Sequence, residues 1–182
     1  MIIDNAGLYP ESLGGNVAVI TDVASGVGSE IALALAHIST AVVAATPDVE
    51  SGSAIVGLIK KRGGSAAYIQ VDTTDPEQAD RFYLEAKKVF GKVDILVVTN
   101  NTGAGSGLFL TEMLERRYGI VVFLGRFSQH ETGISASESD RPPLIEAYIQ
   151  RAGSDGRVAV FSFDTSGASD ELAAAGLVGA IR

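Results

Sequence analysis

Residues 16–38, with the sequence NVAVITDVASGVGSEIALALAHI, determine the fold that we expect for this chain. The short apolar run at residues 17–20 predicts a strand, and a glycine-bearing turn follows it. Beyond the turn, apolar residues recur at helical spacing: Val27, Ile31, Leu33, Ala34, Leu35 and Ile38. A strand, a turn with glycines and a helix in this order are typical of a dinucleotide-binding unit.

The turn itself resembles that of the short-chain dehydrogenase/reductase family, T-G-x-x-x-G-x-G, except that Asp22 stands at the first glycine. The resemblance implies that this segment would hold NAD(P) through Thr21, Asp22, Ser25, Gly26, Val27 and Gly28. In such a turn the pyrophosphate lies against backbone amides and the positive end of the helix. A carboxylate about 4 Å away would repel it by roughly 1 kcal/mol in water and roughly 4 kcal/mol at a protein-like dielectric. We therefore expect no cofactor or weakly bound NAD(P), unless Asp22 turns outward and caps the helix.

Apolar runs and helical patterns alternate along the rest of the chain, and this alternation predicts an α/β protein. We expect a Rossmann-like doubly wound parallel sheet in a three-layer αβα arrangement, with strand order 3-2-1-4-5. The chain should form a single domain, residues 1–182. The five predicted strands are residues 17–21, 40–45, 66–71, 95–99 and 158–163.

Helix signals lie between these strands. Asp48 is a helix-start residue, and the helix after it should stop at Arg62, before Gly63 and Gly64. Asp75 and Pro76 suit the N-cap and first position of the next helix, which would cover the sheet with Phe82, Leu84, Ala86, Val89 and Phe90. The intrinsic preference of residues 120–124 favours a strand. Residues 115–126 nevertheless resemble the family's fourth helix, and we follow the resemblance. Residues 129–143 predict an exposed loop, and the last helix should begin near Ser169 or Asp170.

Two further segments resemble cofactor-binding parts of the family. The stretch beginning with Asp72 and Thr73 resembles D-V-T-D-P-E, in which the first aspartate lies near the adenine, although helix capping explains the same residues. Residues 100–103 (Asn100, Asn101, Thr102 and Gly103) resemble N-N-A-G, which stabilises the sheet centre and lines the ribose. Ala45 and Thr46 occupy the place where relatives read the adenosine ribose, so neither NAD nor NADP is indicated.

The family's catalytic residues are a tyrosine, a lysine four residues later, a serine and an asparagine. No lysine occurs after Lys92, and neither Tyr118 nor Tyr148 has a lysine four residues later. We therefore expect Y-x-x-x-K to be absent and the chain to have no catalytic residue. By the resemblance of residues 177–182 to A-L-V-G-L-T-R, the tyrosine, lysine, serine and asparagine positions fall on Asp170, Ala174, Phe163 and Tyr118, with Ser162 as a remnant serine or Ser166 if the register slips.

Composition excludes several other classes of protein. The 182 residues contain no cysteine and two histidines, so a metal site is not expected. A net charge of −8 would repel nucleic acid. No run approaches the roughly 18 apolar residues of a membrane span, and the first residues lack the pattern of a signal peptide, so we expect a cytoplasmic protein.

Three functions remain open. The first is a non-catalytic dehydrogenase-like subunit that scaffolds or activates a catalytic dehydrogenase partner. The second is an NAD(P)-dependent short-chain oxidoreductase acting on a carbonyl or alcohol, hydroxyacyl-CoA included, and the third is a nucleotide or small-molecule sensing module. The resemblance covers residues 13–182 and about two-thirds of a family member's length, so the strand at 158–163 should be a sheet edge that another chain covers, or that residues outside this sequence cover. A homo- or hetero-oligomer would form through the fourth and fifth helices, where small residues such as Gly179 allow close approach.

Overall fold

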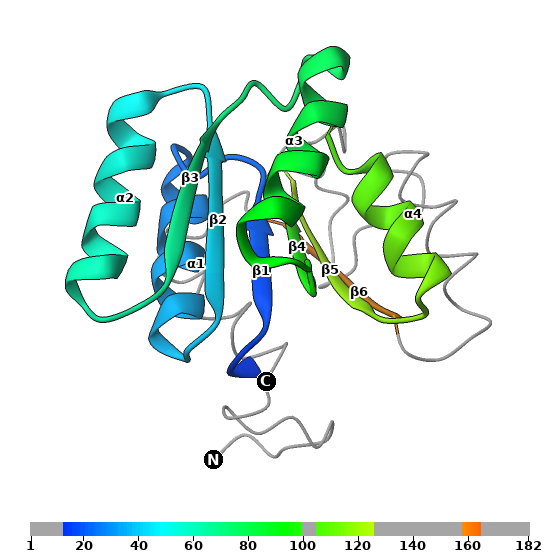
Figure 1. The fold of residues 1–182 in the computed structure, drawn as a ribbon, viewed down its shortest axis with the longest axis horizontal. Coiled ribbons are helices and arrows are strands. Elements are labelled where there is room, and N and C mark those ends of the chain that lie inside the picture. The colour runs from blue at the N-terminus through cyan, green and yellow to red at the C-terminus, as the bar shows by residue number, and fades with distance from the viewer. Residues whose placement is uncertain (1–12, 100–104, 126–157, 165–182) are drawn as a thin grey trace, which may run out of the picture.

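Parallel strands form one sheet at the centre of the computed structural model, which describes residues 13–99, 105–125 and 158–164. Within these residues the sheet has six strands in the order β3-β2-β1-β4-β5-β6. Figure 1 shows β1 in the middle, with β2 and β3 on one side and β4 to β6 on the other. The strands are β1 Val17–Ile20, β2 Ala41–Thr46, β3 Ala66–Gln70, β4 Ile95–Val98, β5 Gly119–Gly125 and β6 Val158–Asp164.

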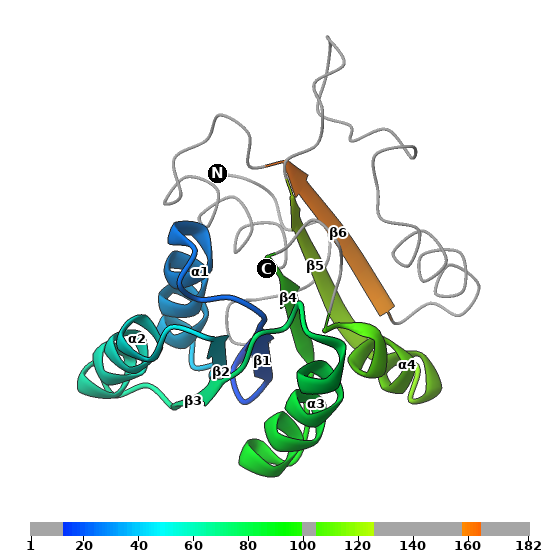
Figure 2. The same cartoon turned by 90° about the horizontal axis from the view of Figure 1, so that it is seen from above.

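Helices cover both faces of this sheet, as the view in Figure 2 makes plain. Helices α1 (Gly26–His37) and α2 (Val49–Lys61) pack on one face, and α3 (Pro76–Phe90) and α4 (Gly107–Glu115) pack on the other. Alternate side chains of β1 enter opposite cores: Ala18 and Ile20 face α1, whereas Val17 and Val19 face α3. The expected three-layer Rossmann-like fold with order 3-2-1-4-5 is confirmed.

One predicted element is wrong. Residues 120–124, which we expected within a helix, lie in β5 and pair in parallel with β4, Ile95 opposite Ile120 and Val98 opposite Phe123. The β-branched and aromatic side chains of this run fit a pleated surface buried on both faces, which outweighed the family pattern. The expected fifth strand is consequently β6, which pairs with β5 from Gly119 opposite Val158 to Gly125 opposite Asp164.

The predicted helix ends agree with the structure. Asp48 caps α2 by accepting the Glu50 amide at 3.1 Å, and Asp75 caps α3 by accepting the Glu77 amide at 2.9 Å. Helix α2 ends at its C-cap Arg62, and Gly63 follows with a φ of +84°.

The inward face of α3 was predicted only in part. Phe82 and Ala86 are buried against the sheet, as expected. Leu84 is instead 55% exposed, because the helical period of 3.6 places it opposite the Phe82–Ala86 stripe. Val89 lies on the side of the stripe but in the last turn of α3, and it is 39% exposed.

Candidate dinucleotide site

The carboxyl ends of β1, β3 and β4 meet at one edge of the sheet, and helix α1 begins at this edge (Figure 1). Strand β1 ends at Ile20, and residues 21–25 form the turn into α1. Ligands of open parallel sheets bind outside the carboxyl ends of the strands, where the helix N-terminus offers amides to an anion. The resembling turn is therefore placed where a dinucleotide would lie.

Within the turn, the half-buried Asp22 bonds to a backbone amide of the turn itself, and Ser25 caps the helix. An Asp22 carboxylate oxygen, Oδ1, accepts the Ala24 amide at 2.9 Å. The Ser25 hydroxyl donates to the Asp22 carbonyl at 2.9 Å and accepts the Gly28 amide at 3.2 Å. The cap of α1 is thus Ser25, not Asp22. Asp22 is not among the described non-glycine residues with positive φ, so its replacement of glycine brings no left-handed strain.

Gly28 is needed for the close approach of helix and turn. A Cβ at this position would lie 2.2 Å from the Asp22 carbonyl oxygen and 2.7 Å from the Ser25 hydroxyl. Because the first of these neighbours is backbone, no side-chain rotation could relieve the contact. The last glycine of the motif therefore has a structural reason that holds without any cofactor.

Threonine hydroxyls join the three strand ends. The Thr21 hydroxyl accepts the Thr99 amide at 3.1 Å and lies 3.3 Å from the Thr99 hydroxyl. The buried Thr73 donates its hydroxyl to the Thr21 carbonyl at 3.3 Å. Thr21 and Thr73, which the resemblance assigns to cofactor binding, therefore connect the end of β1 to the residue after β4 and to the segment after β3.

Asp72 is exposed to solvent in part and makes a local turn. Its Oδ1 accepts the Thr74 hydroxyl at 2.6 Å and the Thr74 amide at 2.9 Å. These two hydrogen bonds, the hydroxyl first, hold the pKa of the Asp72 carboxyl below its usual range. The Asp72 carboxylate can accept hydrogen bonds from ribose hydroxyls or the adenine amino group.

A hollow of about 200 Å³ lies beside this segment, between the first turns of α3 and α4. Thr73, Gly105 and Leu108 are among the residues that line it. Gly105 has a φ of +78°, and a Cβ there would lie 2.9 Å from the Thr73 Cβ, so glycine permits this close approach. The predicted ribose-lining residues Asn100, Asn101, Thr102 and Gly103 lie outside the described residues.

The carboxyl end of β2 offers no free acid. Thr46 is buried, and its hydroxyl accepts the Asp48 amide at 3.3 Å. The Asp48 carboxylate accepts both the Glu50 amide and the Ser51 hydroxyl, which stabilise the start of α2. This arrangement agrees with the prediction that Asp48 is a helix-start residue.

The four family catalytic positions are not brought together among the described residues. Tyr118 is 42% exposed and directly precedes β5, at the amino edge of the sheet, opposite the edge that carries the turn. Ser162 and Phe163 lie near the carboxyl end of β6, in register with Phe123 and Leu124 of β5. Asp170 and Ala174, like Ser166, lie outside the described residues.

One Y-x-x-x-K does occur, which corrects our expectation: Tyr83 and Lys87 on α3. The Tyr83 hydroxyl donates to Glu112 Oε2 of α4 at 2.6 Å, and the Lys87 ammonium lies 3.0 Å from Glu112 Oε1. Burial, followed by the bond to Glu112, raises the pKa of Tyr83. A general base near neutral pH needs a lowered pKa, so this pair has the family spacing without the family chemistry. It connects two helices.

Tyr83→Phe should lower the free energy of unfolding by about 1 kcal/mol at pH 7, because the hydrogen bond to a charged acceptor is lost. The edge-to-face contact of the ring with Phe109, at 5.1 Å, would remain. Burial raises the pKa of Glu112, but the bonds from Tyr83 and Lys87 outweigh it and leave that pKa lowered. This stabilisation is present above the unfolded pKa of Glu112 and is lost as pH falls through its folded pKa.

Urea unfolding of the wild type and of Tyr83→Phe, at neutral and at strongly acidic pH, would measure how much the bond to Glu112 contributes to the free energy of unfolding. The difference between wild type and Tyr83→Phe should shrink in acid, and Tyr68→Phe, which leaves Glu112 untouched, is the matched control. An equal difference at both pH values would contradict the assignment.

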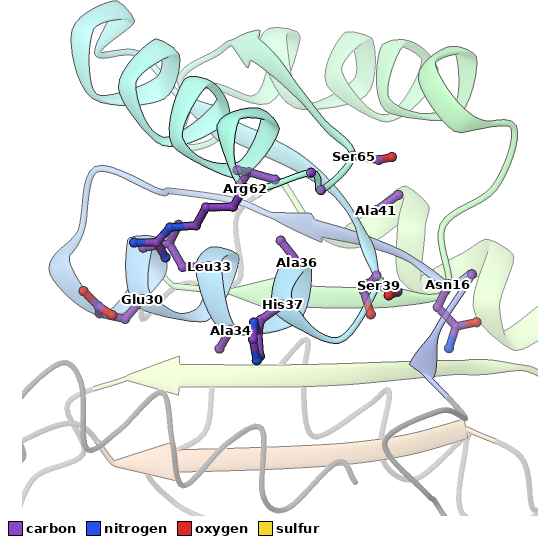
Figure 3. A pocket seen from close by; sticks show the side chains of 15 residues that line it. Asn16, Glu30, Leu33, Ala34, Ala36, His37, Ser39, Ala41, Arg62 and Ser65 are labelled. Atoms are coloured by element: carbon purple, nitrogen blue, oxygen red, sulfur yellow. The ribbon is translucent and has the colours of Figure 1, made fainter.

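A larger hollow, of about 770 Å³, lies elsewhere, along the carboxyl-terminal halves of α1 and α2 (Figure 3). His37, Ser39, Arg62 and Ser65 are among its lining residues, and the Arg62 side chain extends toward α1. It lies at the amino ends of β2 and β3, so it is not part of the turn site. The described residues contain no group of acids and histidines that could hold a metal ion. None of the described helices is both long and apolar enough to cross a membrane.

Comparison with known proteins agrees with this geometry. Residues 16–122 match the family model described as short chain dehydrogenase. The chain therefore belongs to the short-chain dehydrogenase family. It is 35% identical over 101 residues to trihydroxynaphthalene reductase of Colletotrichum orbiculare and 34% identical over 114 residues to elsinochrome reductase 1 of Elsinoe fawcettii. These matches cover 55% and 61% of this chain but only 35% and 41% of the relatives, so the chain spans about two fifths of their length.

Solved structures share the fold at low sequence identity. A metagenomic short-chain oxidoreductase in complex with NADP matches with a TM-score of 0.72 at 19% identity, over 93% of this chain and 90% of that one. A 7α-hydroxysteroid dehydrogenase complexed with NADH and 7-oxo glycochenodeoxycholic acid matches with a TM-score of 0.69 at 21% identity, over 84% and 71%. The three-layer αβα fold of this chain is thus also the fold of these two structures.

Proposed function

We propose that the chain is an NAD(P)-dependent short-chain oxidoreductase acting on a carbonyl or alcohol, and that the described residues form its cofactor-binding half. The observation that carries the proposal is the β1–turn–α1 unit. Its Gly28 packs against the Asp22 carbonyl, and the helix N-terminus opens at the carboxyl edge of the sheet. The reductase names of the relatives support the same class of reaction.

The residues of the turn fit a dinucleotide only in part. The first amides of α1 and the partly exposed Asp72 suit a phosphate and a ribose or adenine, respectively. Asp22 opposes the phosphate by its charge. A bound nicotinamide would supply or accept a hydride, while this chain's residues would bind and orient it.

The test is direct titration of the purified chain with NADPH and with NADH, followed by nucleotide fluorescence and calorimetry. We expect saturable but weak binding, with a dissociation constant of about 0.1 to 1 mM for at least one of them. The same titrations with Gly28→Ala should show no saturation, because the added Cβ would collide with the Asp22 carbonyl oxygen and disrupt the turn. Equal behaviour of wild type and Gly28→Ala would contradict the proposal.

A second candidate is the non-catalytic subunit of a dehydrogenase assembly. The one Y-x-x-x-K of the sequence, Tyr83 and Lys87, is bound to Glu112 between α3 and α4, and this favours a chain that performs no chemistry by itself. Of the two helices through which we expected association, the fourth, at residues 115–126, is for the most part the strand β5, and residues 170–182 lie outside the described residues. Co-purification of an intact dehydrogenase from the native source would support this candidate, and recovery of the chain alone with reductase activity would eliminate it.

A further inference from the structure

Asp22 provides the turn with an anion of its own. Its carboxylate accepts the Ala24 amide at 2.9 Å, and the Ser25 hydroxyl accepts the Gly28 amide at 3.2 Å. Both amides belong to the segment whose N–H groups face the pyrophosphate in a dinucleotide-binding unit. Two of the donors that a phosphate would use are therefore already bound within the chain.

We propose that Asp22 is a built-in competitor of the pyrophosphate, so that it lowers the affinity of this site for adenosine diphosphate and dinucleotides and leaves its affinity for adenosine unchanged. The inference rests on the proposed function, because it concerns the same site. It assigns Asp22 the role of limiting affinity.

The backbone of Asp22 is held in place around this carboxylate. Its carbonyl accepts the hydroxyls of Ser25 at 2.9 Å and of Thr99 at 3.4 Å. The same carbonyl lies against Gly28, where a Cβ would come within 2.2 Å. A phosphate could therefore displace the carboxylate by side-chain rotation but could not move the residue out of the turn.

The charge of Asp22 acts in the same direction as the occupied amide. Among the described residues, Asp22 takes part in none of the three ion pairs. Two like charges about 4 Å apart weaken binding by roughly fivefold in water and by up to roughly a thousandfold at a protein-like dielectric. Asp22 is partly exposed, so an effect between these limits follows.

Two variants separate charge from hydrogen bonding. Asp22→Asn removes the charge and keeps an oxygen that can accept the Ala24 amide. Asp22→Gly removes both, and because the described backbone at this position does not have positive φ, neither variant imposes a new conformation on the turn. Circular dichroism and thermal unfolding of each variant would establish that it is folded.

The experiment is calorimetric titration of wild type, Asp22→Asn and Asp22→Gly with adenosine, ADP and NADPH at low and high salt. For ADP and NADPH we expect binding to tighten by about tenfold in Asp22→Asn and further in Asp22→Gly. Adenosine should bind all three proteins within about twofold, because it carries no phosphate. Glu30→Gln, an acid on α1 outside the turn, is the matched control and should change none of the affinities.

The outcomes distinguish this inference from the function on which it rests. Tight NADPH binding that is equal in wild type and both variants would overturn the role of Asp22 and leave the oxidoreductase proposal standing. Absence of binding of every nucleotide to every folded variant would overturn both. A gain for NADPH that is matched by an equal gain for adenosine would show that phosphate repulsion is not the cause, and would also overturn the inference.

Discussion

Asp94→Ala should lower the free energy of unfolding by about 3 kcal/mol, the larger of the two main stability effects that we expect. Asp94 precedes β4 at the amino edge of the sheet and is only 4% exposed. Its Oδ2 accepts the Val17 amide at 3.0 Å and lies 2.8 Å from the Lys92 ammonium. Arg116 approaches the other carboxylate oxygen, at 3.8 Å. Alanine would leave the buried Val17 amide without this acceptor.

The change should affect more than one strand, because the backbone of Asp94 joins β4 to both β1 and β5. Its amide donates to the Val17 carbonyl at 2.8 Å, and its carbonyl accepts the Ile120 amide at 2.9 Å. The side chain thus holds β1 at the point where the Asp94 backbone joins β1, β4 and β5. Loosening it should weaken the start of all three strands together.

Urea unfolding monitored by circular dichroism would measure the loss as a lower midpoint. Asp80→Ala, on the exposed side of α3, is the matched control and should stay within about 0.5 kcal/mol of wild type. Asp94→Asn keeps an acceptor for Val17 and loses the charge, so it should cost about 1 to 2 kcal/mol. If Asp94→Ala unfolds at the midpoint of the control, the carboxylate does not stabilise the sheet.

The sequence predicted most of the fold because its signals were local and agreed with one another. Asp48 and Asp75 are acids at helix starts, and the structure places both as N-caps. Short apolar runs bounded by such caps leave little choice but parallel strands connected by helices. The prediction was wrong at residues 120–124. Their intrinsic preference for a strand was correct, and the resemblance to the family's fourth helix was not.

The candidate site was harder to predict, since it depends on how side chains bond within the turn. The substitution at Asp22 was visible in the sequence, but its bond to the Ala24 amide was not. Thr99 was expected only as a strand residue, yet its amide and hydroxyl join β4 to the turn. Tyr83 and Lys87 could have been found by reading the four-residue spacing over the whole chain. Their partner Glu112 is 25 residues beyond Lys87, and only the packing of α3 on α4 brings it near.

A second large effect should appear within one helix, where two glycines respond to alanine in opposite directions. Gly52 and Gly57 both lie in α2. A Cβ on Gly52 would come within 2.2 Å of the Tyr68 ring of β3, whereas a Cβ on Gly57 would meet nothing within 4 Å. Alanine favours a helix over glycine by about 0.5 to 1 kcal/mol. Gly57→Ala should therefore stabilise the protein by that amount.

Gly52→Ala should instead destabilise it by about 2 kcal/mol, after the helical gain is subtracted. The Tyr68 ring would have to leave its place against α2, and its hydroxyl would lose the bond to the Thr46 carbonyl, now 3.0 Å. Thermal and urea unfolding of both variants, and of each in a Tyr68→Ala background, would measure the coupling. With the ring removed, Gly52→Ala should become stabilising like Gly57→Ala, since only the helical preference remains. If Gly52→Ala is equally destabilising with and without Tyr68, the close contact between α2 and β3 is not the cause.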